Sequence, residues 1–164
     1  MLRIQITKRP DGSGVLRCTR SDGSVTWQKQ RQGVFFAHHD LTHFAVETTL
    51  AYTSGFYGLI AAGWDIADTT GKGARGPLPD DAREVEHLVG ALDVERAGST
   101  RWTVAEFNDH LAQAAASSGR SRELTEEDLV HVRSKRAELF AQWAALPFGE
   151  TLELEFPHAG VALR

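Results

Sequence analysis

Segments of alternating polarity lie at both ends of the chain, and this arrangement constrains the fold more than any other feature of the sequence. Apolar residues occupy every second position of these segments: Leu2, Ile4 and Ile6, and then Leu152, Leu154 and Phe156. Alternation places the apolar side chains on one face of a β-strand. Because the sequence in between carries helix signals, we predict an α+β fold, in which a small antiparallel sheet built from both ends packs against helices.

Two more strands are predicted directly after the first one. The turn sequences Pro10-Asp11-Gly12 and Ser21-Asp22-Gly23 mark off the short segments 15–19 and 25–28. Turns of this kind connect neighbouring antiparallel strands. We therefore expect an N-terminal three-stranded meander, which the C-terminal strand joins.

Local capping signals mark the starts of two helices. Thr103 with Glu106, and Thr125 with Asp128, have the spacing of a capping box, in which each side chain binds the backbone of the other residue. An apolar stripe continues from the second start until Pro147 ends that helix.

Three more helices are expected before these two. One covers about 37–52, a short buried one lies within 55–66, and another begins with Asp80 as its cap and ends at Gly98. The chain has 164 residues, of which 41% are hydrophobic and 24% are charged. A chain of this size and composition can bury one sizeable core, so we predict a single domain over 1–164 with about five helices.

Charge and cysteine content limit the classes of partner. The formal net charge of −4 gives no attraction for phosphate backbones, so nucleic acid is not an expected partner. The sequence has no run of about 18 apolar residues and no export-type leader, so no membrane partner is expected. The single Cys18 cannot form an internal disulfide, which fits the cytoplasm. The sequence leaves the oligomeric state open.

The segment 39–47 contains the pattern that points to chemistry. His39, His43 and Glu47 recur at every fourth residue, and they therefore share one face of the predicted helix. Two imidazoles at this spacing can bind one divalent cation. Residues eight positions apart are separated by about 12 Å along a helix, so Glu47 is expected to orient a ligand or to hold a second ion.

A third ligand for the same ion has to come from another element. Glu86 and His87 are the first choice, ahead of a wider set of candidates: Glu84, Asp65, Asp68, His110 and His131. Catalytic zinc commonly has three protein ligands and a water whose pKa falls to about 7. Zinc is therefore the expected ion, and Asp40 is the candidate base for that water. A small molecule or a peptide would be the substrate of such a hydrolase.

The residues between the two histidines carry a family resemblance. His39-Asp40-Leu41-Thr42-His43 resembles the HExxH helix of zincin metallopeptidases, with aspartate in the place of the glutamate. The resemblance implies zinc bound by both histidines and a catalytic acid between them. Aspartate is one methylene shorter, so its carboxylate would lie about 1 to 1.5 Å further from the water. The longer pattern HDLxHxxVE, followed by Gly55-Phe56-x-Gly58, resembles a group of small bacterial proteins whose activity is uncharacterised.

The same residues also allow a structural interpretation. Asp40 is a good helix N-cap, and a helix that begins there would leave His39 outside it. Histidines on a half-buried face are often hydrogen-bonded core residues. The alternative to a metal-dependent hydrolase is therefore a non-catalytic binding or regulatory domain, in which the His/Glu face is structural.

The glycine-rich loop 69–77 is a second candidate site. Lys72 and Arg75 lie next to glycines whose backbone N–H groups could bind an anionic group of a substrate. The P-loop pattern is absent, because Ile66 stands where it requires glycine and no Ser or Thr follows Lys72. A surface loop is the main interpretation, and a substrate lid is the alternative.

Overall fold

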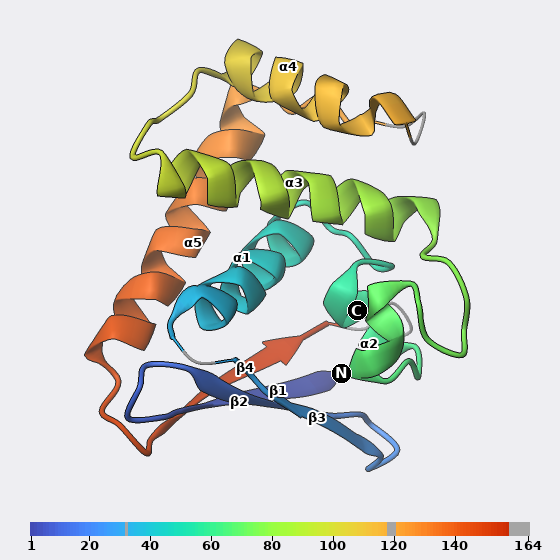
Figure 1. The fold of residues 1–164 in the computed structure, drawn as a ribbon, viewed down its shortest axis with the longest axis vertical. Helices are drawn as coiled ribbons and strands as arrows, with labels where there is room; N and C mark the ends of the chain where they lie inside the picture. The colour runs from blue at the N-terminus through green and yellow to red at the C-terminus, as the bar shows by residue number, and fades with distance from the viewer. Residues whose placement is uncertain (32, 118–120, 158–164) are drawn as a thin grey trace, which may run out of the picture.

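One antiparallel sheet joins the two ends of the chain in the computed structural model, which describes residues 1–31, 33–117 and 121–157. Its strands are β1 Leu2–Lys8, β2 Gly14–Thr19, β3 Val25–Lys29 and β4 Thr151–Phe156. Their order in the sheet is β3-β2-β1-β4. The N-terminal meander and the C-terminal strand therefore pair as predicted, and together with the helices they confirm the α+β fold (Figure 1).

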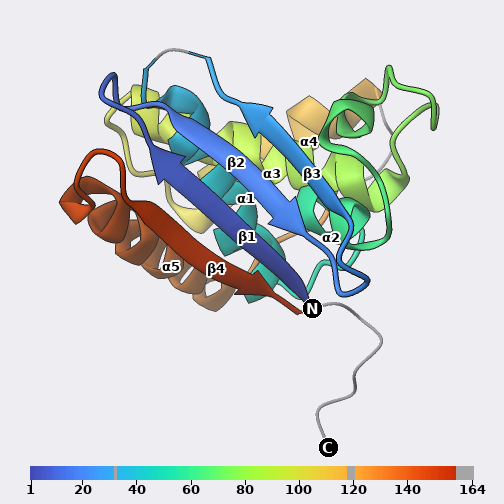
Figure 2. The same cartoon turned by 90° about the horizontal axis from the view of Figure 1, so that it is seen from below.

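The sheet has one apolar and one polar face. Ile4 of β1 pairs with Cys18 of β2, and the residues of the apolar face are buried: Leu2, Ile4, Ile6, Leu16, Cys18 and Phe156. On the opposite face Gln5 lies between Arg17 and Glu153 and hydrogen-bonds to both. Figure 2 looks onto this polar face, and the helices lie behind the sheet.

Five α-helices lie within the described residues, and they stack in layers on the apolar face. They are α1 Phe35–Thr49, α2 Phe56–Ala61, α3 Asp80–Ala97, α4 Val104–Ala114 and α5 Glu126–Ala145, with short 3₁₀ helices at Ile66–Thr70 (η1) and Ala115–Ser117 (η2). Helices α1, α2 and part of α5 lie next to the sheet, α3 crosses α1, and α4 lies beyond α3 (Figure 1). None of the described helices combines the length and the apolar character needed to cross a membrane.

The helix ends follow local chemistry, with one difference from the predicted caps. Both capping boxes are formed, at Thr103 and at Thr125, and Gly98 takes the C-cap position of α3. The expected cap Asp80 is instead the first residue of α3, because Pro79 occupies the cap position.

Two helices in the middle of the chain differ in extent from the prediction. Helix α1 begins and ends earlier than the predicted range 37–52. Val34 takes its N-cap position, and at the other end the C-cap Leu50 is followed by Ala51, whose backbone is left-handed (φ 58°). The short buried helix expected within 55–66 is limited to α2, since Gly63 has a left-handed backbone (φ 100°) directly after the C-cap residue.

Helix α1 is buried from two sides because it lies between two apolar clusters. One cluster joins the sheet to α1, α2 and α5 and includes Leu41, Phe44 and Trp143. The other joins the end of α1 to α3, α4 and α5 and includes Val46 and Val85. Polar residues on the α3 side of α1 are therefore buried together with the apolar ones.

Candidate metal centre

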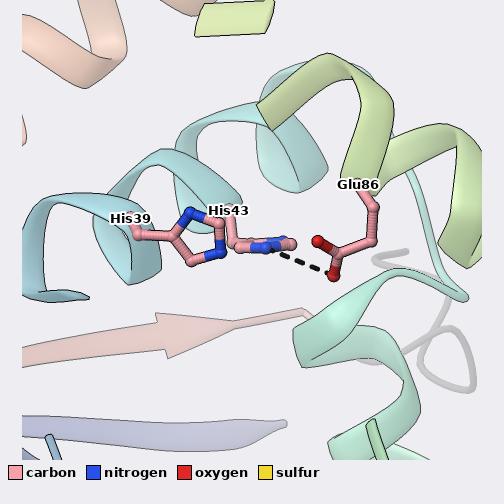
Figure 3. A group of neighbouring side chains, drawn as sticks. All are labelled: His39, His43 and Glu86. Carbon is pink, nitrogen blue, oxygen red and sulfur yellow. Dashed lines mark ion pairs between the residues drawn. The ribbon is translucent and has the colours of Figure 1, made fainter. Parts of the chain in front are cut away.

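Two helices bring three side chains with metal-binding atoms together. His39 and His43 project from the same side of α1, and Glu86 of α3 points toward them (Figure 3). Each residue offers one ligand atom, and these atoms all lie within 4.8 Å of one another. Nε2 of His43 is 3.5 Å from Oε1 of Glu86, and the two imidazole centroids are 4.8 Å apart. The structure thus places one acid from another helix beside the two histidines.

Packing between α1 and α3 fixes this arrangement. Val85 is fully buried in the cluster that also contains the end of α1, and Glu86 follows it in the sequence. Buried apolar contacts hold two helices in one register. Glu86 lies beside His43, and Asp93, about two turns later in α3, lies beside His39. The two helices therefore run antiparallel at this contact.

A carboxylate lies behind each imidazole. Nδ1 of His39 is 2.8 Å from Oδ2 of Asp93, and Nδ1 of His43 is 3.4 Å from Oε1 of Glu47. In metal sites such carboxylates fix the orientation of the imidazole and leave its other nitrogen for the ion. Sequence reasoning missed Asp93, although its spacing of seven residues from Glu86 places both acids on one face of α3.

Glu47 is held in place by the start of α2. Its carboxylate accepts hydrogen bonds from the backbone N–H groups of Tyr57 (3.2 Å) and Gly58 (3.1 Å), and the residue is buried. Gly55 passes so close that a Cβ atom there would lie 2.5 Å from Cδ of Glu47. These contacts place Glu47 behind His43, outside the group of three.

Asp40 is a buried carboxyl group within α1. The structure excludes the alternative in which Asp40 caps this helix, because α1 begins at Phe35 and contains His39. Nε2 of Gln30 donates a hydrogen bond to Oδ2 of Asp40. Burial raises the pKa of Asp40 to about 6, against the opposing effect of His43 and His39. Asp40 is therefore able to gain and lose a proton near neutral pH.

His43 and Glu86 form an ion pair when no metal is bound. Burial opposes the positive charge on His43, but Glu86 and Glu47 outweigh this effect and raise the pKa of His43 to about 10. Burial also acts to raise the pKa of Glu86, yet His43 and His39 hold it below its ordinary value. A divalent cation bound here would replace the imidazole proton as the partner of the carboxylate.

A cavity of about 590 Å³ reaches this group of residues. Its apolar wall is formed by Leu16, Phe36, Phe56, Ile66 and Leu78. Its polar wall contains Gln28, Gln30, Arg31, Thr69 and Thr70. Asp40, His39, His43 and Glu86 complete the lining. A cavity of this size and mixed lining is typical of sites for small molecules.

Other residues predicted for the site lie elsewhere. His87 is not part of the group of three, and Lys72 and Arg75 do not line the cavity. Arg75 donates a hydrogen bond to the carbonyl of Gly63 (2.8 Å), and its guanidinium lies 5.6 Å from the ring of Trp64. The wider set of ligand candidates is also outside the group: Glu84, Asp65, Asp68, His110 and His131.

No known protein-family model matches this chain, and no curated protein or solved structure is significantly similar to it. The function therefore has to be inferred from the site itself.

Proposed function

We propose that this chain binds one divalent transition metal ion, for which zinc fits best, through His39, His43 and Glu86. The observation that carries the proposal is the convergence of three ligand atoms within 4.8 Å at the wall of a cavity. Imidazole and carboxylate ligands suit zinc. Among the residues that the structure describes, no further His, Cys or acid joins this group, so one coordination position would face the cavity.

Small shifts of the side chains are enough to bind an ion. Metal bonds of about 2.0 to 2.2 Å in a tetrahedron place ligand atoms about 3.3 to 3.6 Å apart, whereas the atoms here lie within 4.8 Å. The Glu86 side chain is 40% exposed, so it has room to rotate toward the histidines. Asp93 and Glu47 already lie at the Nδ1 atoms of the two histidines, so the Nε2 atoms need little reorientation.

We further propose that the centre supports hydrolysis of a small molecule or a short peptide. Zinc, when bound, supplies a water of lowered pKa and polarises the group that is cleaved. Asp40 lines the same cavity and is the carboxyl group available to accept a proton from that water. Glu47 and Asp93 would orient the histidines rather than touch the substrate.

A non-catalytic role is the second candidate, and one observation favours it. His39 with Asp93, and His43 with Glu86, pair directly across the contact between α1 and α3. These contacts by themselves stabilise the packing of the two helices. In that case the His/Glu face is structural, and the protein is a binding or regulatory domain built around the same cavity.

Metal content and metal affinity test the first step of the proposal. Protein purified without chelators is expected to carry a stoichiometric transition metal by mass spectrometry, and zinc should raise the melting temperature of the stripped protein. Glu86→Gln and His43→Gln should each weaken zinc binding by more than about tenfold, because each removes a ligand. His110→Gln changes a histidine outside the group and is the matched control. Native protein without metal, whose melting temperature does not respond to zinc, would contradict the proposal.

Turnover by the zinc-loaded protein tests the second step. Asp40→Asn should retain zinc and lose the hydrolysis that wild type shows on a panel of esters, amides and dipeptides. Asp109→Asn removes an exposed carboxylate and is the control. Unchanged turnover in Asp40→Asn would remove Asp40 from the reaction. A zinc-loaded wild type that cleaves none of the panel would favour the non-catalytic candidate.

A further inference from the structure

Arg31 is the one lysine or arginine among the described residues that line the cavity. It lies just beyond the end of β3, on a different element from the three ligand candidates. Its guanidinium carbon is 5.9 Å from the ring of Phe36, another lining residue. The cavity therefore contains a cationic group besides the proposed metal centre.

The guanidinium of Arg31 keeps its hydrogen-bond donors available. Within the described part of the chain it makes no hydrogen bond or ion pair, and the ring of Phe36 is its contact. Other arginines are committed to the fold: Arg20 donates to the carbonyl of Ile60, and Arg133 binds Glu95. An arginine presents a planar fork of donors that matches a carboxylate. A guanidinium at a cavity wall whose N–H donors are unpaired is therefore a binding group for an anion.

The charge of the cavity depends on the metal. Arg31 and the protonated His43, which pairs with Glu86, each contribute +1, and Asp40 and Glu86 each contribute −1 when ionised, so the charged side chains of the lining sum to 0 without an ion. A divalent cation that takes the place of the imidazole proton changes the sum to +1. The loaded cavity therefore attracts an anion, whereas the metal-free cavity does not.

We propose that the cavity binds a small organic carboxylate, with its carboxylate on Arg31, its apolar body against the apolar wall, and a second polar group on the metal. The inference rests on the proposed metal centre and adds the chemical class of its ligand. A ligand with one negative charge balances the +1 of the loaded cavity. Phe36 and Phe56 supply the apolar surface that distinguishes such a ligand from an inorganic anion.

Hydroxamic acids that carry a carboxylate at the other end of an alkyl chain test this assignment on the zinc-loaded full chain. The hydroxamate binds zinc, and a series of chain lengths spans the cavity. Each free acid is compared with its methyl ester, which has the same shape without the charge. At one chain length or more, the free acid is expected to bind wild type about tenfold or more tightly than its ester, because an arginine and a carboxylate form charge-assisted hydrogen bonds.

Arg31→Gln is expected to abolish this preference while the affinities for the ester and for zinc stay within about twofold of wild type. Arg17→Gln removes the same charge from the polar face of the sheet and should keep the preference. A free acid with no advantage at any chain length, or an advantage that survives Arg31→Gln, would overturn the inference while the metal centre stands. Failure of the wild type to bind zinc at all would refute the metal centre and the inference together.

Discussion

Replacement of Asp40 by asparagine is expected to stabilise the metal-free protein at neutral pH. Asp40 is 8% exposed, and burial raises its pKa from 3.8 to about 6. An acid with a higher pKa in the folded state stabilises the fold in its protonated form. That contribution is complete below the unfolded pKa and is lost as the pH rises through the folded pKa. Above that window the buried charge lowers the free energy of unfolding, and asparagine removes this cost.

The magnitude follows from the pKa difference. The interval between 3.8 and about 6 is about 2.2 units, which corresponds to about 3 kcal/mol at about 1.4 kcal/mol per unit. Asparagine keeps an oxygen that can accept the hydrogen bond from Gln30, but a neutral acceptor is weaker by about 1 kcal/mol. The expected gain is therefore about 1 to 3 kcal/mol at neutral pH, and less than about 1 kcal/mol near pH 4.

Urea unfolding followed by tryptophan fluorescence measures this gain, with EDTA present and at pH values of about 4.5 and about 7.5. Asp109→Asn removes an exposed aspartate and is the matched control. The stability of Asp40→Asn relative to wild type should increase between the two pH values. A variant no more stable than wild type at the higher pH, or a difference that does not change with pH, would refute the reasoning. A gain would indicate that Asp40 is retained for a purpose other than folding.

Three further predictions follow from particular contacts. Thr103→Ala removes the formed capping box of α4 and should lower the free energy of unfolding by about 1 kcal/mol in urea, with no change in zinc affinity. Gly55→Ala places a Cβ against Glu47, so calorimetry should show zinc binding weakened by about tenfold; Gly90→Ala, where a Cβ meets nothing within 4 Å, is the control and should bind zinc like wild type. Cys18 is buried, and burial raises the pKa of its thiol to about 12, so Ellman's reagent should react with it at mildly alkaline pH in unfolded protein and not in native protein.

The parts of the fold that could be predicted from the sequence are those that local chemistry determines. The sheet could be predicted because its signals act within a few residues. These signals are the alternation in β1 and β4 and the Asp-Gly turns between the first three strands. The capping boxes at Thr103 and Thr125 are also local. The start of α1 was predicted too late, because Val34 caps it without a side-chain hydrogen bond and carries no recognisable signal.

The candidate site could be predicted in part, because two of its three ligand candidates lie within one helix. His39 and His43 share a face of α1 by spacing alone. The rise of the helix also predicts that Glu47 lies too far from His39 for both to bind the same ion. The contacts of Glu86 and Asp93 depend on how α3 packs across α1, which no local pattern records. The position of Arg31 at the cavity also depends on tertiary packing, because this packing brings the segment after β3 to the cavity wall.

A comparison with the buried acids of α3 shows why Glu86 is available to a cation at the cavity wall. Three further acids of α3 are 5 to 8% exposed, and each is bound by a side chain from another part of the chain: Glu84 by Tyr52, Asp93 by His39, and Glu95 by Arg133. The Glu86 side chain is 40% exposed and lies 3.5 Å from His43 at the cavity wall. An ion bound by Glu86 and the two histidines would join α3 to α1 and leave the other three contacts intact. Because these ligands meet only when the helices pack, the free energy of zinc binding adds directly to the stability of that packing.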